Sequence, residues 1–369
     1  MVPNGWLHKQ IGEIASIQVG RDLVEDKYSE ISTTEYKYPV YSNTVENKGL
    51  YGFYNFPEYS GNAITIVGRG VGLGKAFARS PGESFGAIGR LLVLTPKNNS
   101  FDVIFFANYI NFALRIHNES GGIPQLPGAS LSKYFVMLPP LAEQQKIAQI
   151  LSTWDKAIAV TEQLLANSQQ QKKALMQQLL TGKKRLLDEN GARFEGEWEE
   201  FSLGNIAKVY QPKTISQSQL SFDGYPVYGA NGIIGYYCDF NHELEQIAVT
   251  CRGSTCGVVN WTMPKSWITG NAMVINVDNN SAISKKFLFY VLSNADLKYL
   301  ITGSGQPQIT GDIKNHVVHL ASFKEQKVIA QVLTIADQEI KALQRKIDCL
   351  QQEKKALMQQ LLTGKRRVK

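Results

Sequence analysis

The feature that most constrains this chain of 369 residues is an internal repeat. The segment Lys172–Arg185 recurs almost unchanged as Lys354–Arg367, at an offset of 182 residues. When 143–185 is aligned with 325–367, 23 of 43 positions are identical without a gap, which is far more than shared composition would produce. A repeat of this size predicts one structural unit built twice, so we expect two half-molecules in tandem.

Each repeated segment also has the hydrophobic spacing of a long helix. Apolar residues recur at alternating intervals of four and three, which is the heptad pattern of a coiled coil. Thr-Gly ends both segments, and glycine is a common helix stop. Because one chain supplies two matching helices, we expect them to pair with each other, antiparallel, rather than with a second chain. The predicted seam comprises Ile147, Leu151, Trp154, Ile158, Leu165, Leu175, Leu179, Ile329, Leu333, Ile340, Leu343, Ile347, Leu350, Leu357 and Leu361.

The remainder of each half is predicted to be a globular domain of the α+β class. Short runs of β-branched and apolar residues alternate with Gly, Asn, Ser and Pro, which is typical of short strands joined by loops. Strands are expected at 63–67, 91–94, 247–251, 272–277 and 317–320, and helices at 103–116 and 285–300. The expected divisions are globular domains at 1–140 and 198–322, helices at 141–182 and 323–364, a linker at 183–197, and a basic tail at 365–369. Together they predict two tandem domains separated by a coiled coil, with pseudo-two-fold symmetry.

Charge and composition narrow the class of protein. The net charge of +7 is concentrated in the helical segments: 141–185 has seven basic and three acidic residues, and 323–369 has eleven and five. A basic balance favours a polyanionic partner. No apolar run reaches the ~20 residues that cross a bilayer, and no signal peptide is visible. Four cysteines make no disulfide framework, so a reducing, cytoplasmic location without a membrane partner is expected.

No catalytic set is evident in the sequence. The glycine-rich stretch 68–74 follows an expected strand, but Leu73 occupies the place of the third glycine in a nucleotide-binding motif. We interpret it as a tight loop with an exposed arginine. Cys238, His242, Cys251 and Cys256 could be imagined as a zinc site, but their spacing is unusual and the first half has no counterpart. Buried or strand cysteines are the preferred interpretation, and no metal is expected.

Polar loop residues suit contacts with DNA. Arg69 and Arg252 occupy equivalent places and are flanked by glycine, which permits close approach to a phosphate or a guanine edge. Glutamine can bond adenine with both of its side-chain atoms. The candidate DNA-binding residues are Arg69, Lys75, Arg90, Gln125, Asn231, Arg252, Ser254, Gln306 and Gln308.

With these features together, the chain resembles the specificity subunit of type I restriction–modification enzymes. The resemblance is carried by Leu138–Gln144 (LPPLAEQ), the two ALMQQLLTGK helix ends, and Gly305–Thr310 (GQPQIT). It covers the whole chain. Two departures are Ala321–Lys324, where the family often has Pro-Pro-Leu, and Gly121–Gln125, which lacks the first glutamine of the loop motif.

The resemblance implies a non-catalytic subunit. Each globular half would be a target recognition domain that reads one half of a bipartite, asymmetric target in double-stranded DNA. The helices would set the spacing and dock two modification subunits, which bind S-adenosylmethionine and methylate adenine. Restriction subunits, which use ATP and Mg, would join through the complex, and this chain would hold no cofactor. Two alternatives stay open: a methyltransferase or nuclease with an unrecognised site, and a coiled-coil adaptor without sequence specificity.

Overall fold

The computed structural model describes residues 3–118, 120–303 and 305–368. It divides into two compact units, of which unit 1 comprises 1–162 and 345–369 and unit 2 comprises 163–344. These bounds differ from the predicted domains because each unit takes half of both long helices, α4 (Leu141–Leu179) and α7 (Phe323–Leu361). No helix among the described residues is long and apolar enough to cross a bilayer.

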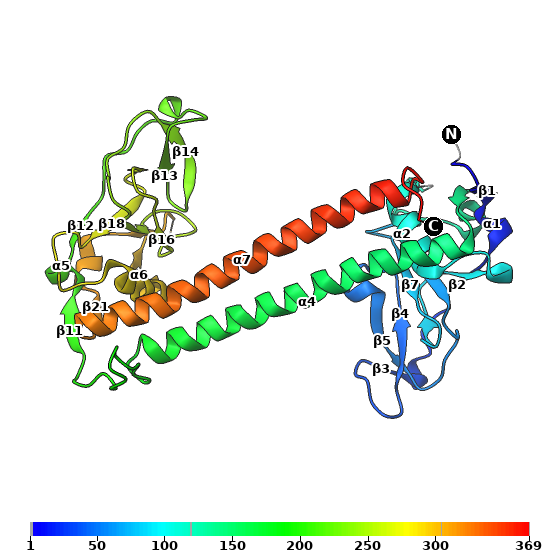
Figure 1. Ribbon diagram of the computed structural model, residues 1–369, viewed down its shortest axis with the longest axis horizontal. Coiled ribbons are helices and arrows are strands. Elements are labelled where there is room, and N and C mark those ends of the chain that lie inside the picture. The colour runs from blue at the N-terminus through cyan, green and yellow to red at the C-terminus, as the bar shows by residue number, and fades with distance from the viewer. Residues whose placement is uncertain (1–2, 119, 304, 369) are drawn as a thin grey trace. The chain divides into compact units, whose positions relative to one another are not determined.

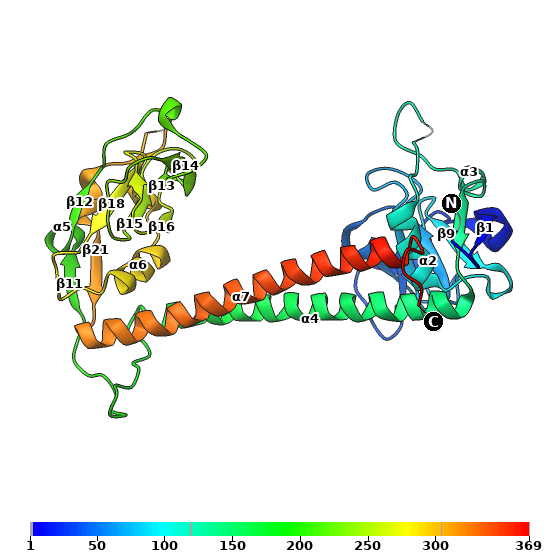
Figure 2. The ribbon, with the colours of Figure 1, turned by 45° about the horizontal axis from the view of Figure 1, so that its top comes forward.

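Unit 1 is built on two four-stranded sheets and a short two-stranded one. The first sheet has the order β2-β9-β6-β7 and the second the order β3-β5-β4-β8, while β1 pairs with β10. Figure 2 shows α2 beside these strands and the end of α7. The bounds are β1 Leu7–Gln10, α1 Ile11–Ile14, β2 Ala15–Val19, β3 Tyr28–Ser29, β4 Tyr38–Tyr41, β5 Leu50–Tyr54, β6 Ala63–Ile66, β7 Ala76–Arg79, β8 Gly86–Ala87, β9 Leu92–Pro96, α2 Val103–Ala113, α3 Gly128–Leu131 and β10 Phe135–Leu138.

Unit 2 repeats this plan. Its four-stranded sheet, β12-β18-β15-β16, corresponds to the first sheet of unit 1, and β14-β13-β17 corresponds to the second. β11 pairs with β21 as β1 pairs with β10. The bounds are β11 Glu199–Ser202, α5 Leu203–Ile206, β12 Lys208–Tyr210, β13 Tyr225–Tyr228, β14 Ile233–Tyr237, β15 Ile247–Thr250, β16 Val259–Trp261, β17 Trp267–Ile268, β18 Ala272–Asn276, α6 Lys285–Asn294, β19 Ile301–Thr302, β20 Gln308–Ile309 and β21 Val317–Leu320.

Strand alternation separates the core of unit 1 into two layers. Leu92 and Leu94 of β9 belong to the cluster that includes α2, whereas Val93 between them belongs to the cluster of Tyr41 and Phe85. This is the expected consequence of a period of two, because neighbouring side chains point to opposite faces of a strand. Since both faces are covered, these strands read as continuous apolar runs.

A glutamine at the start of each long helix joins it to the globular part. Gln144 accepts a hydrogen bond from the Asp102 amide (2.9 Å) and donates to the Pro139 carbonyl (2.9 Å). In unit 2, Gln326 accepts from the Ser284 amide (2.8 Å) and donates to a carbonyl in the same way. Both glutamines are buried, so these bonds fix how α4 meets α2 and how α7 meets α6.

Within each unit the two helix segments run antiparallel. In unit 1, Glu143 pairs with Arg367 (2.7 Å) while Asp155, further along α4, pairs with Lys354, which lies earlier in the chain (2.5 Å). In unit 2 the counterparts at the same offset pair likewise: Glu325 with Arg185 (2.7 Å), and Asp337 with Lys172 (2.6 Å). Every predicted seam residue of both helices is buried or half-buried. The α+β class with two long antiparallel helices is confirmed.

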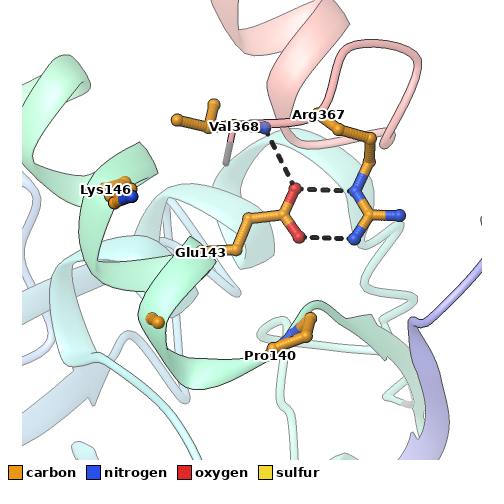
Figure 3. Close-up of a pocket in the computed structure, with 6 residues that line it drawn as sticks. Pro140, Glu143, Lys146, Arg367 and Val368 are labelled. Carbon is orange, nitrogen blue, oxygen red and sulfur yellow. Dashed lines mark hydrogen bonds and ion pairs between the residues drawn. The ribbon is translucent and has the colours of Figure 1, made fainter.

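The chain after each helix folds back onto it. Gly182 and Gly364 both adopt φ of +69°, the left-handed conformation that glycine adopts without strain. The amide of Arg366 then donates to the Gln360 carbonyl (3.0 Å) of the last helical turn. Figure 3 shows the result in unit 1: both Glu143 carboxylate oxygens accept bonds from Arg367, and one also accepts from the Val368 amide. Within the predicted tail at 365–369, Arg367 and Val368 thus bond to Glu143 of the same unit.

Candidate nucleic-acid interface

The structure brings the predicted arginine and glutamine loops together in each unit. Arg69 and Gln125 are antiparallel bridge partners, and so are Arg252 and Gln308. Residues directly opposite in an antiparallel pair project to the same face, about 5 Å apart at Cβ. Each unit therefore presents a guanidinium and a carboxamide from the same short ladder, although 56 residues of chain separate them in both cases.

The hydrogen bonds of the two ladders match one for one. The Gly70 amide donates to the Pro124 carbonyl (2.9 Å), and the Gly253 amide donates to the Pro307 carbonyl (3.0 Å). On the other side of the arginine, Leu126 donates to the Gly68 carbonyl and Ile309 to the Cys251 carbonyl. The equivalence that the sequence suggested for the two arginines is thus present in the backbone.

The glycine that follows each arginine is required because the backbone there has a positive φ, and not because a side chain would clash with neighbouring atoms. Gly70 has φ of +88° and Gly253 has φ of +84°, and an added Cβ at either would meet nothing within 4 Å. The backbone at these turns is therefore open to solvent beside the arginine. A phosphate or a base edge can approach it closely.

In unit 1 the ladder forms one wall of a small pocket. Arg69, Arg90 and Gln125 line a cavity of about 170 Å³, together with Val19 and Leu92. Arg90 is exposed and has φ of +66°, a strained conformation for a residue with a side chain. Its guanidinium belongs to the second arginine that lines this cavity.

The other candidates lie on exposed loops. Lys75 is exposed at the end of the glycine-rich loop, where it lines a different cavity, with Asn111 and Ile116, and does not join the Arg69 pocket. In unit 2, Ser254 is exposed two residues after Arg252, and Gln306 is exposed in the turn between β19 and β20. Asn231 is exposed in the turn between β13 and β14.

Two positioning residues of unit 1 were missed by the sequence analysis. The Asn43 side chain accepts a bond from the Gly68 amide (2.8 Å) and donates to the Gly89 carbonyl, so it links the loops of Arg69 and Arg90. The Asn118 carboxamide oxygen accepts from the Gln125 amide (3.1 Å). Asparagine in a loop has no periodicity to reveal it, and its role follows only from contacts over long sequence separations.

Of the cysteines considered for zinc, Cys251 is buried and Cys256 is half-buried, whereas Cys238 is exposed just after β14, so the prediction of buried or strand cysteines is wrong for Cys238. His242 Nε2 lies 2.8 Å from the Tyr210 hydroxyl, and Cys251 Sγ accepts a bond from Gln211 at 3.1 Å. Burial raises the pKa of the Cys251 thiol above its usual value, so it remains protonated and packs in the core. The described residues contain no group of three or more His, Cys, Asp or Glu able to hold a metal ion.

Comparison with known proteins gives the class that this geometry belongs to. The family model of the type I restriction modification DNA specificity domain matches residues 3–167 and again 195–352. These ranges cover most of the chain, one in each half. The chain therefore belongs to this family, and the resemblance noted from the repeat and loop motifs is confirmed.

Individual relatives and structures agree. A putative type I specificity subunit of Mycoplasma pneumoniae is 27% identical over 337 residues, which is 88% of this chain and 87% of the relative. The MjaVIII specificity subunit of Methanocaldococcus jannaschii is 22% identical over 100% of this chain and 94% of its own. The S subunit of the type I restriction-modification system from M. genitalium has the same fold, with a TM-score of 0.73, 18% identity and coverage of 98% and 99%. The chain is thus a DNA-recognition subunit with two domains.

Proposed function

We propose that each unit of this specificity subunit reads one half of a bipartite, asymmetric target in double-stranded DNA. The observation that carries the proposal is the Arg–Gln ladder, which occurs once per unit on the same backbone hydrogen bonds. Arginine can bond guanine O6 and N7, and glutamine can bond adenine N6 and N7, so the ladder offers direct readout of the major groove. Beyond the shared ladder the two loop sets differ, as reading two different half-sites requires.

The long helices hold the two readers and receive the modification subunits under this proposal. The helix ends are the most similar part of the repeat, which is expected if they meet two copies of one partner. S-adenosylmethionine would be bound by the modification subunits, which methylate adenine, and ATP with Mg by the restriction subunits. This chain supplies positioning and specificity, and its activity is therefore observable only in the assembled complex.

Domain exchange tests the proposal. Residues 1–140 are replaced by the equivalent domain of a relative, the complete system is expressed, and the methylated motif is mapped across the host genome. We expect one half-site to change and the other to stay. The matched experiment replaces 198–322 and must change the opposite half-site only. If either exchange alters both halves or neither, the two units do not read independently.

Two further outcomes separate the other classes of function. Methylation or cleavage by the purified chain alone would make it an enzyme in its own right. Equal affinity of the complex for duplexes with and without the motif, at fixed salt concentration, would make the chain an adaptor without sequence specificity.

A further inference from the structure

Unit 2 contains a charged aromatic pocket that the DNA-reading role does not use. It has a volume of about 290 Å³ and lies where α6 meets α4 and α7. Figures 1 and 2 both show α6 lying against α7 in this unit. We define the Lys286 pocket by six of its lining residues, Lys172, Trp261, Lys286, Phe289, Asp337 and Lys341.

The ammonium of Lys286 is held by aromatic rings and lacks an ionic partner. It lies 3.9 Å from the Trp261 ring centroid and 4.7 Å from that of Phe289. The side chain is half-buried, and no carboxylate of the described residues lies within 4.0 Å of its nitrogen. Burial is the main cause that lowers the pKa of Lys286, the charge of Asp337 opposes this shift, and neighbouring Lys341 lowers the pKa further. A positive charge fixed in this way gains from any anion that enters.

The nearby carboxylates do not fill this role. Asp337 is occupied by Lys172 (2.6 Å) and by the Tyr290 hydroxyl (2.6 Å). Glu245 raises the pKa of Lys286 less than Asp337 does. Lys286 is also the second residue of α6, where the helix dipole disfavours a cation and favours an anion. The pocket therefore has an excess of positive charge that the chain itself does not balance.

At the equivalent positions, unit 1 has neither the lysine nor the tryptophan. Ile104 is the second residue of α2 and corresponds to Lys286, while Ala78, opposite Ile64 in β7, corresponds to Trp261, opposite Ile247 in β16. The ion pair Asp337–Lys172 of the pocket does have a counterpart in unit 1, which is Asp155–Lys354. The shared core of the fold therefore does not require the lysine and the tryptophan, which occur in one half only.

The position of the pocket separates it from the DNA-reading ladder. In the β15–β16 hairpin, Trp261 pairs with Ile247, whereas Arg252 lies beyond the other end of β15. Five residues of extended chain separate Ile247 from Arg252, which is roughly 17 Å. Trp, Tyr, Phe and Met are typical of protein interfaces, and buried charge pairs at such interfaces are often binding hot spots. The distance from Arg252 and the aromatic lining both favour a protein, rather than a DNA phosphate, as the partner of this pocket.

We propose that the Lys286 pocket binds a carboxylate side chain of a protein partner, which under the proposed function is one of the two modification subunits. The carboxylate would meet Lys286 and Lys341, and its carbon chain would pack on Trp261. Because unit 1 has Ile104 and Ala78 in place of Lys286 and Trp261, the two modification subunits would be bound with unequal strength. This inference rests on the proposed function for the identity of the partner.

A zero-length crosslink identifies the contact directly. The complex of this chain with its modification subunits is treated with a carbodiimide, which joins an ammonium to a carboxylate only when the two touch. We expect mass spectrometry to find an amide between Lys286 or Lys341 and an Asp or Glu of the modification subunit. Crosslinks from other lysines of the chain, with none from these two, would overturn the proposal.

Substitutions give the second readout. Lys286→Met keeps the aliphatic packing and removes the charge, and Lys286→Arg keeps the charge. We expect Lys286→Met to weaken binding of the second modification subunit about 10- to 100-fold, so that native mass spectrometry shows one subunit instead of two at low concentration. Lys286→Arg is expected to stay within about threefold. Lys324→Met, an exposed lysine about 25 Å from Lys341 along the axis of α7, is the matched control.

The outcomes are separable. If the unaltered chain binds no modification subunit, the proposed function fails, and the pocket proposal with it. If the unaltered complex assembles and methylates, and Lys286→Met binds two subunits with unchanged affinity, only the pocket proposal fails. If Lys286→Met assembles normally but binds duplex DNA more weakly, the pocket contacts a DNA phosphate. That result would also overturn the pocket proposal.

Discussion

The arginines of the two ladders are the residues most directly tied to DNA reading. Arg252 is exposed and Arg69 is half-exposed, and each is held at a turn whose glycine conformation is fixed. A side chain presented in this way is free to reach a base edge. Its backbone stays in place through hydrogen bonds to a second loop.

Removing one of these arginines is expected to affect one half-site only. Arg69→Ala or Arg252→Ala should cost ~1–3 kcal/mol in binding and relax one base position if the arginine reads a base. Loss of a phosphate contact should instead lower the affinity for all DNA sequences alike. It should also reduce the slope of log affinity against log salt concentration by about one. Affinity of the complex for variant duplexes at several salt concentrations measures both. Arg193→Ala, in an exposed linker, is the control. Unchanged affinity at every salt concentration would exclude both roles.

The ion pairs that close each helix pair have unequal burial. Arg185 is 19% exposed beside a completely buried Glu325, whereas Arg367 is 38% exposed beside a Glu143 that is 7% exposed. Removing the cation from a buried pair leaves an uncompensated charge, which costs about 3–5 kcal/mol. We expect Arg185→Ala to lower the free energy of unfolding by about this amount, and Arg367→Ala by less. Denaturant unfolding measures both, with Lys9→Ala in an exposed pair as the control, expected to change stability by under about 1 kcal/mol. Equal effects of the two arginine variants would contradict the burial argument.

The same pairing predicts a pH dependence in unit 1. The hydrogen bonds from Arg367 lower the pKa of Glu143 below its ordinary value of 4.5. Because the folded pKa is lowered, the pair stabilises the fold above the unfolded value and loses this contribution as the pH falls through the folded pKa. Urea midpoints between pH 6 and 3 should therefore fall more steeply for the natural chain than for Glu143→Gln. Parallel curves for the two proteins would show that this carboxylate does not contribute.

At the scale of the helical element, the seam is apolar with a few polar positions. Ser168 is nearly buried and its hydroxyl donates to Glu339 (3.3 Å), while Thr161 bonds the Ala157 carbonyl of its own helix. Each buried hydroxyl thus has a partner, as buried polar groups require. Each long helix is followed by a glycine, Gly182 after α4 and Gly364 after α7. The turn at this glycine brings the arginine that follows back to a glutamate at the start of the other helix, Glu325 or Glu143.

The two terminal glycines form a matched pair for mutagenesis. Both need a positive φ, so alanine at either costs ~1–2 kcal/mol. At Gly364 the added Cβ would also lie 2.5 Å from the Pro3 ring, whereas at Gly182 it would meet Trp198 at an ordinary 3.5 Å. We expect Gly364→Ala to destabilise the protein by ~1–3 kcal/mol more than Gly182→Ala. Thermal unfolding of the two variants decides this, and an equal loss would mean that Pro3 moves aside freely.

At the scale of the whole molecule, α4 and α7 are continuous from unit 1 into unit 2. Each unit locks its own helix segments together by two ion pairs, so the register of the pair is set independently in both units. A change of helix length must therefore be made in both helices to keep these pairs intact.

Lengthening both helices is expected to lengthen the gap in the DNA target. Four residues inserted after Glu162 and four after Gln344 add about one turn, ~6 Å, and leave the seam nearly in phase. The complex should then methylate the same half-sites separated by one or two more base pairs, as mapped across the genome. Two-residue insertions rotate the seam by about 200° and should prevent assembly. An active four-residue variant with the original gap would show that the helices do not set the distance.

Much of this organisation could be predicted from the sequence. The repeat at an offset of 182 implies two like units, because identical segments in one chain fold alike, and the spacing of apolar residues implies long helices, because a helix has a period near 3.6. The predicted strands at 63–67, 247–251 and 317–320 and the helices at 103–116 and 285–300 occur with ends shifted by up to six residues. These elements can be predicted from the local periodicity of apolar residues, without knowing which other segments they pack against.

Only the tertiary structure decided which residues meet across long separations. The pairing of Arg69 with Gln125, the role of Asn43 between two loops, and the lysine over Trp261 depend on how strands and loops pack. Loop side chains have no period, so the sequence could name Arg69 and Gln125 singly but could not place them side by side. The sequence by itself determined the repeat and its helices, because those follow from interactions a few residues apart. The surfaces follow from contacts between distant segments, which only the folded chain brings together.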